Sequence, residues 1–156
     1  MDEDAPPRVG DTLMFGRTPL HLAARSGDIE SAERLLEKAD DRELIGTPDD
    51  HGFTPLYHTA MFGNVAVMSL LLRRGADIQK ADLGGLSPLH IACEKGRAEA
   101  AVVLLENGAD LHASDSIGRE PKAWAEAKGH VNVLAAIRDW QGARERRLLD
   151  AADGAT

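Results

Sequence analysis

Three stretches of the chain place apolar residues on one face of a helix and polar residues on the other. Intervals of three and four residues between apolar positions are typical of an amphipathic helix that buries one side. The stretches recur at a nearly constant distance along the chain, which predicts a repeated unit. Their apolar positions are Ile29, Ala32, Leu35 and Leu36; then Val65, Val67, Met68, Leu71 and Leu72; and then Ala101, Val102, Leu104 and Leu105.

A shorter helix is predicted in front of each stretch. Thr or Ser followed by Pro can begin a helix, because the hydroxyl accepts a bond from a free backbone N–H and proline has no N–H to leave unpaired. A glycine eight residues after each proline can take the left-handed conformation that ends the helix. The prolines are Pro19, Pro55, Pro88 and Pro121, spaced 36, 33 and 33 residues apart, and the glycines are Gly27, Gly63, Gly96 and Gly129.

The units are expected to stack in a row, because one pair of short helices cannot bury its own apolar face. Two motifs recur in the same place of their units: Thr18-Pro19-Leu20-His21-Leu22-Ala23-Ala24 with Ser87-Pro88-Leu89-His90-Ile91-Ala92, and Leu71 to Asp77 with Leu104 to Asp110. Motifs that recur in phase are a specific signal, and these resemble the ankyrin repeat. The resemblance implies an all-α solenoid of stacked helix-turn-helix units with hairpin-like loops.

The resemblance covers residues 13–140 as four ankyrin repeats, at about 13–48, 49–81, 82–114 and 115–140. The first repeat has an enlarged, acidic loop at residues 39–48. The fourth has Glu120, Lys122 and Ala123 in place of the hydroxyl, leucine and histidine of the motif, which predicts a degenerate C-terminal cap whose outer face meets water. Its last helix is expected over about residues 131–140. Residues 1–12 are predicted to be a flexible acidic tail, and residues 141–156 a C-terminal tail that either extends the stack as helix or projects from it.

Charge and cysteine content narrow the class of partner. The chain has 156 residues and a net charge of −8, which repels phosphate backbones, so no nucleic-acid partner is expected. The single cysteine, Cys93, fits a reducing compartment, which predicts a cytoplasmic or nuclear protein. No apolar run approaches the roughly 18 residues that a membrane span needs, so no membrane insertion is expected.

The sequence lacks the motifs of common enzymes, phosphate-binding loops and metal sites. His21 and His90 are expected to form hydrogen bonds between neighbouring units. His51 and His58 could approach each other, but their spacing supplies no third metal ligand. Cys93 takes a small-residue position and is expected to be buried rather than reactive. The chain is therefore predicted not to be an enzyme and to hold no metal or cofactor.

The resemblance implies a concave binding side formed by the loop tips and the first helices. Large apolar residues that gather on an exposed face mark a partner site. Phe53, Met61 and Phe62 are the strongest candidates, whereas loop residues such as Leu83, Leu86 and Ile117 could instead pack between neighbouring loops. The candidate partner-binding residues are Phe15, Arg17, His51, Phe53, Met61, Phe62, Leu86, Glu94 and Arg119.

Two functions fit these observations. The first is a non-catalytic adaptor that binds a partner protein through the concave side. The alternative is a structural subunit that is permanently part of a large multiprotein assembly. Carboxylates near the N-terminus and at residues 33–50 could steer a basic partner, or could serve only solubility.

Overall fold

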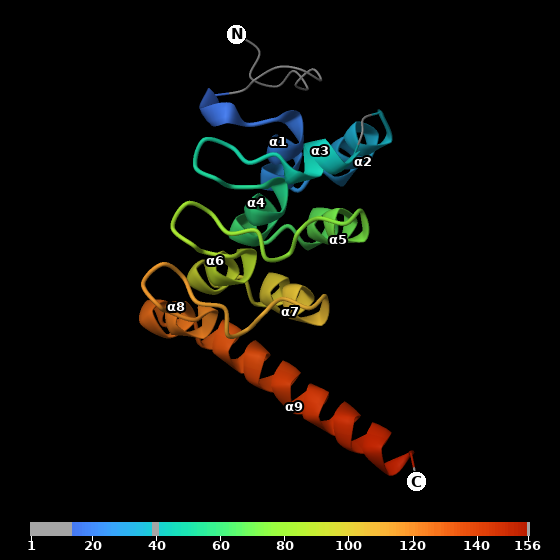
Figure 1. Cartoon of the computed structure of the whole chain (residues 1–156), viewed down its shortest axis with the longest axis vertical. Coiled ribbons are helices and arrows are strands. Elements are labelled where there is room, and N and C mark those ends of the chain that lie inside the picture. The colour runs from blue at the N-terminus through green and yellow to red at the C-terminus, as the bar shows by residue number, and fades with distance from the viewer. Residues whose placement is uncertain (1–13, 39–40, 156) are drawn as a thin grey trace.

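The computed structural model describes residues 14–38 and 41–155, and its regular elements are helices (Figure 1). They are η1 (Met14–Gly16), α1 (Pro19–Ser26), α2 (Ile29–Lys38), α3 (Asp41–Gly46), α4 (Pro55–Phe62), α5 (Val65–Arg73), α6 (Pro88–Glu94), α7 (Ala98–Glu106), α8 (Pro121–Lys128) and α9 (Val131–Asp153). The all-α ankyrin-type fold expected from the sequence is confirmed. The expected acidic tail at residues 1–12 lies outside the described residues.

The first helix of each unit begins and ends as its sequence predicts. The Thr54 hydroxyl accepts a hydrogen bond from the Tyr57 N–H at 3.2 Å, directly before the proline that opens α4. Ser87 does the same for the His90 N–H at the start of α6. α4 ends at Gly63, whose φ of 75° is the left-handed conformation that glycine takes without strain.

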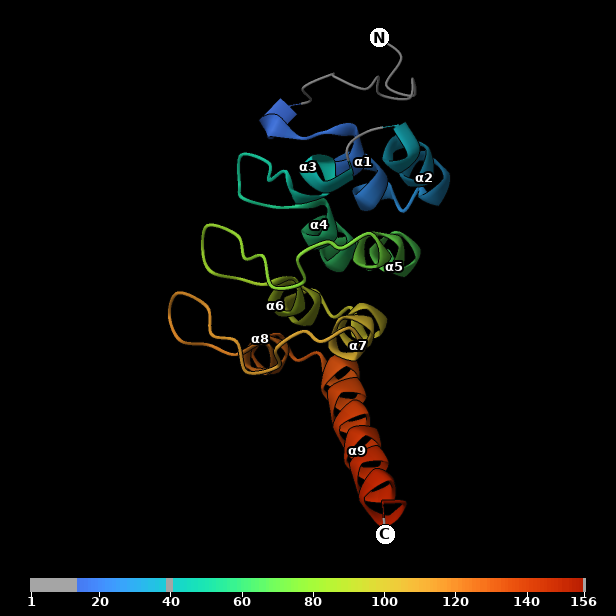
Figure 2. The same cartoon turned by 45° about the vertical axis from the view of Figure 1, so that its right-hand side comes forward.

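The helices form two parallel rows (Figures 1 and 2). α1, α4, α6 and α8 pack side by side in one row, and α2, α5, α7 and the first part of α9 form the other. Hairpin-like loops project from the side of the first row. Each unit therefore contacts mainly its neighbours, as in other repeat architectures.

The core lies between the two rows and repeats from unit to unit. Leu20, Leu56 and Leu89 hold the same position of the first helix, and each is at most 1% exposed. Leu71 and Leu104 are equivalent residues of the second helix and are fully buried. Burying a side chain of this size contributes about 1.5–3 kcal/mol, so each of these repeated leucines adds substantially to stability.

The enlarged loop of the first repeat contains a helix that the sequence pattern did not predict. α3 spans part of the expected loop, and its Ile45 is only 4% exposed while Leu44 packs against the core. Two adjacent apolar side chains within the acidic segment thus anchor it to the array and favour helix over open loop.

The last helix is much longer than the predicted 131–140. α9 buries Val133 and Ile137 against the array, then continues past Trp140 to Asp153. Figures 1 and 2 show that this second half projects away from the stacked units. Gly142 is the weakest helix former in this part, and one glycine costs about 1 kcal/mol, which does not end a helix. Leu148 and Leu149 are consequently 62% and 65% exposed.

The fourth unit presents polar residues where earlier units bury apolar ones. Cys93 is fully buried, whereas Glu126, at the same position one unit later, is exposed. Leu105 is 3% exposed, whereas the equivalent Arg138 has a side chain that is 78% exposed. Among the described residues, no helix is both long and apolar enough to cross a lipid bilayer.

Candidate binding surface

Each loop after the first unit is held rigid by one aspartate. In the second unit, Asp49 Oδ1 accepts hydrogen bonds from the N–H groups of His51 and Phe53, both at 3.0 Å. Asp82 and Asp115 make the equivalent bonds in the next two loops, with lengths between 2.8 and 3.0 Å. These bonds fix the backbone of the loop tips and so preorganise any side chain placed there.

The second carboxylate oxygen of each aspartate ties the loop to a helix. Asp49 Oδ2 accepts from His58 Nε2 at 2.9 Å, and Asp115 Oδ2 accepts from Trp124 Nε1 at 3.0 Å, nine residues further along in both cases. Asp82 instead accepts from the hydroxyl of Tyr57 in the preceding unit, at 2.8 Å. The loops are therefore braced both within units and between them.

Histidines bridge neighbouring units, as the sequence predicted. His21 Nε2 donates to the Phe53 carbonyl at 2.8 Å, and His90 Nε2 donates to the Arg119 carbonyl at 3.0 Å. The Nδ1 atom of His21 accepts from the Thr18 N–H at 3.0 Å, which assigns the proton to Nε2. In the second unit Tyr57 takes the position of these histidines, and its hydroxyl donates to Asp82 in the next loop.

Exposed apolar side chains lie in η1 and at the tips of the loops braced by Asp82 and Asp115. We call Met14, Phe15, Leu83 and Ile117 the loop-tip row; they are 78%, 51%, 83% and 68% exposed. The idea that Leu83 and Ile117 pack between neighbouring loops is therefore wrong. Both residues precede a glycine in a tight turn, which directs them away from the stem, and the sequence alone does not fix that direction.

Four candidates are half-buried rather than free. Phe53 stacks on Tyr57 with ring centroids 4.4 Å apart, and Phe53, Met61 and Leu86 all pack against the core. Phe62 lies beneath Arg25, whose guanidinium carbon is 5.0 Å from the ring centroid. These side chains support the fold and also offer part of their surface.

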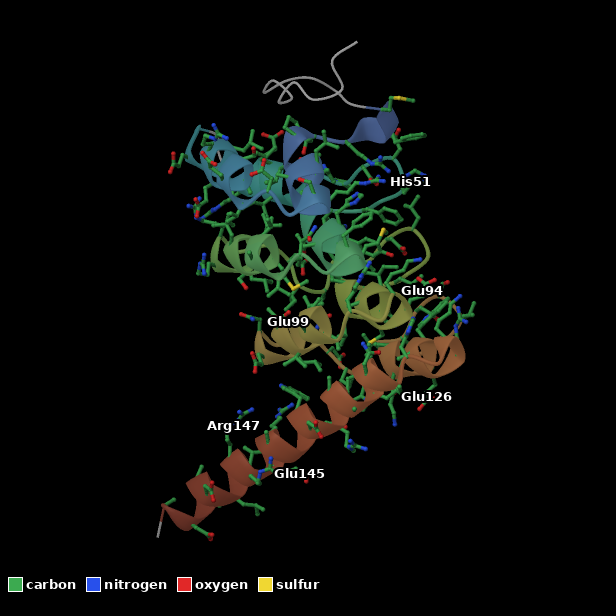
Figure 3. The ribbon with its side chains drawn as sticks, turned by 180° about the vertical axis from the view of Figure 1, so that it is seen from behind. His51, Glu94, Glu99, Glu126, Glu145 and Arg147 are labelled. Atoms are coloured by element: carbon green, nitrogen blue, oxygen red, sulfur yellow. The ribbon has the colours of Figure 1, made fainter. Side chains whose placement is uncertain are left out.

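The other candidates surround the loops and first helices. His51 is exposed and lies between the rings of Phe15 and Phe53, with centroids 5.8 and 5.4 Å away. Arg17 covers Phe15 at 5.3 Å. The remaining two are Glu94, which pairs with Lys95 at 3.8 Å, and Arg119, which stacks 3.6 Å from the Trp124 centroid. Figure 3 shows His51, Glu94 and Glu126 along the side of the loops and first helices, and Glu99 on the other row.

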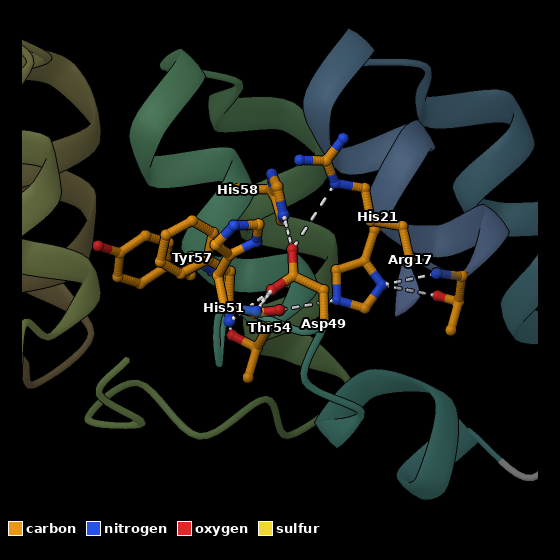
Figure 4. A network of polar contacts seen from close by, with 9 residues as sticks. Arg17, His21, Asp49, His51, Thr54, Tyr57 and His58 are labelled. Atoms are coloured by element: carbon orange, nitrogen blue, oxygen red, sulfur yellow. Dashed lines mark hydrogen bonds and ion pairs between the residues drawn. The ribbon is translucent and has the colours of Figure 1, made fainter. Parts of the chain in front are cut away.

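One buried polar cluster joins the first two units (Figure 4). His21, Asp49 and His58 are at most 5% exposed and bring one ligand atom each within 4.8 Å of the others. Arg17 Nε lies 3.7 Å from Asp49 Oδ2. Sequence reasoning considered His58 with His51 and missed this trio, because Asp49 and His21 come from a loop and from another unit.

The hydrogen bonds of His21 and the positive charge of Arg17 favour a hydrogen-bonded role for this trio over a metal site. Burial lowers the pKa of both His21 and His58, so the rings are neutral at pH 7. Burial raises the pKa of Asp49, but hydrogen bonds from His58, Phe53 and His51 outweigh it and lower the pKa overall. Two histidines and a carboxylate are ligands that zinc accepts, but His21 would lose its bond to Phe53, and Arg17 already supplies positive charge.

The comparison with known families agrees with this geometry. A family model described as ankyrin repeats in three copies matches residues 2–82 and also residues 42–115. The chain belongs to the ankyrin-repeat family. Ankyrin repeats generally mediate protein–protein interaction, and the family is generally a non-catalytic module.

Several curated proteins are similar to parts of this ankyrin-repeat chain. The human transient receptor potential cation channel subfamily A member 1 is 43% identical over 60 residues, which is 38% of this chain and 5% of the channel. An Arabidopsis thaliana ADP-ribosylation factor GTPase-activating protein is 46% identical over 70 residues, or 45% of this chain and 9% of that protein. The human DNA-binding protein RFXANK is 36% identical over 58 residues, or 37% and 22% of the two chains. The matches thus span only a small part of each relative.

Proposed function

We propose that this ankyrin-repeat protein is a non-catalytic adaptor that binds a partner protein through its loop tips and first helices. The observation that carries the proposal is the loop-tip row, four exposed apolar side chains of which Leu83 and Ile117 lie on loops braced by aspartate. Apolar groups that gather on an exposed surface mark interaction sites, and rigid presentation lowers the entropy lost on binding.

The backbone at Phe15 supports the same proposal. Phe15 has φ 68° and ψ 30°, the left-handed conformation in which a bulky side chain is strained by about 1–3 kcal/mol. Glycine would fit this turn better if folding alone mattered. A large ring kept at a strained and exposed position is expected where the ring serves binding.

The test separates binding from folding. Phe15→Gly should leave the free energy of unfolding unchanged within about 1 kcal/mol or raise it, because strain is relieved. The same change, combined with Leu83→Ser and Ile117→Ser, should abolish capture of partner proteins from native extract. Leu148→Ser on the projecting part of α9 is the matched exposed control and should leave capture intact. Full capture by the triple variant would contradict the proposal.

A second candidate is a structural subunit fixed in a larger assembly. The observation in its favour is α9, whose projecting part exposes Leu148 and Leu149 on a side separate from the loop tips. Size-exclusion chromatography of native extract discriminates the two. A free pool at low mass favours the adaptor, whereas elution only at very high mass, lost on Leu148→Ser with Leu149→Ser, favours the subunit.

A further inference from the structure

The C-terminal ends of α1 and α4 carry two cationic side chains, one of which covers an aromatic ring. Arg25 lies in the last turn of α1, and its guanidinium covers Phe62 of α4 at 5.0 Å. Arg97, which follows Gly96, donates from Nε to the Met61 carbonyl at 3.1 Å. We call these residues the Arg25–Phe62–Arg97 cluster. Two guanidiniums thus flank the last residues of one helix.

Both arginines have a role in the fold that leaves their charge available. Cations are favoured at helix C-termini, and the Arg97 Nε bond satisfies one end carbonyl. Asn64 and His130 cap the corresponding carbonyls of units one and three, at 2.9 Å to Arg25 and 2.8 Å to Glu94. An uncharged side chain can do this capping. Capping alone therefore does not explain why Arg97 places a second positive charge beside Arg25.

The charge of the cluster is not neutralised by the protein. In the part of the chain that the structure describes, neither Arg25 nor Arg97 forms an ion pair with a carboxylate, and both are exposed. The nearby Glu94 is paired with Lys95. The cluster is therefore locally positive in a chain of net charge −8. A carboxylate from another molecule could bind a guanidinium with two parallel hydrogen bonds.

We propose that the partner segment bound on the first helices is acidic, with Asp or Glu side chains meeting Arg25 and Arg97 and an adjacent apolar side chain covering Phe62 and Met61. This inference rests on the proposed function, because it names the chemistry of the partner at the same surface. Charge complementarity is the reason for choosing this occupant: a basic partner would be repelled by both guanidiniums.

The test is selection from a random peptide library displayed on phage, with the full chain as bait. Selected peptides should be enriched in Asp and Glu next to an aliphatic or aromatic residue. A synthetic peptide of the selected sequence should bind Arg25→Gln/Arg97→Gln about tenfold more weakly. Its affinity should fall as salt is raised from about 0.1 M to about 1 M. Arg73→Gln, which removes an exposed arginine of the second row, should leave its affinity unchanged.

Charge reversal guards against a folding artefact. Arg25→Glu/Arg97→Glu, checked for an unchanged helical circular dichroism spectrum, should now select peptides rich in Lys and Arg. Wild-type selection of peptides without acidic enrichment, or of basic peptides, would overturn the inference and leave the adaptor function standing. A library that yields no binding peptide would count against the proposed function as well.

Discussion

The second and third units have the same backbone fold but bury different kinds of side chain. α4 buries Tyr57, His58 and Thr59, where α6 buries His90, Ile91 and Ala92 at the equivalent positions. The third unit relies mainly on aliphatic packing, whereas the second encloses a set of polar groups that each need a partner.

Most of the buried polar groups of the second unit form hydrogen bonds, two of them to loop aspartates. The Tyr57 hydroxyl reaches Asp82, His58 Nε2 reaches Asp49, and the Thr59 hydroxyl donates to the Leu56 carbonyl at 2.6 Å. His58 Nδ1 is buried with no partner among the described residues. Buried polar groups are costly unless they are paired. Unit two is therefore less stable than an aliphatic unit would be, but its hydrogen bonds fix the loops in place.

The largest effect should come from the aliphatic core that both units share. Leu104→Ala in α7 and Leu71→Ala in α5 each remove a fully buried side chain, and each should lower the free energy of unfolding by about 3 kcal/mol. Urea denaturation followed by circular dichroism measures both. A loss below about 1 kcal/mol for Leu71→Ala alone would mean that the units differ throughout and not only in their first helices.

A smaller effect is expected in how the free energy of unfolding depends on pH. The pKa values of His21 and His58 are lowered by burial, so the unfolded chain binds more protons than the folded one as pH falls below about 6.5. The free energy of unfolding should therefore fall between pH 7 and pH 5. His58→Ile, which copies unit three, should cost about 1–2 kcal/mol at pH 7 by removing a partner of Asp49, but should flatten this pH dependence.

The control for the pH measurement is His51→Ala, which removes an exposed histidine of the same unit. It should keep the slope of the wild type. An equally steep slope for His58→Ile would show that His58 does not contribute to the pH dependence.

The interior of unit three should be chemically inert. Cys93 is fully buried, and burial raises the pKa of its thiol to about 12. The native protein should therefore react with Ellman's reagent far more slowly than the same protein in denaturant, because the thiolate is the reactive form. Comparable rates in the two conditions would show that α6 opens readily.

The smallest effect is expected for metal removal. If His21, Asp49 and His58 form hydrogen bonds and hold no metal, dialysis against EDTA should leave the thermal midpoint of the purified protein unchanged. Stoichiometric zinc by elemental analysis, with a lower midpoint after dialysis, would reassign the trio as a metal site.

Local, periodic features could be read from the sequence, and features set by distant contacts could not. Helices opened by Pro55 and Pro88 and closed by glycine depend on neighbouring residues alone, so the repeat order and fold class were predictable. The bond between Asp49 and His58 and the exposure of Leu83 depend on how a loop folds back on its stem. The length of α9 was underestimated because the pattern of a repeat says where a unit ends, whereas helix continues until a residue stops it.

Site-specific photocrosslinking in native extract tests the central claim most directly. A benzophenone amino acid placed at Leu83 on the loop-tip row, or at Ala66 on the exposed side of α5, reports which row meets the partner. A defined crosslinked protein from position 83 and none from position 66 is the result predicted here. Crosslinks from position 66 alone would contradict the claim that loop tips and first helices form the binding surface.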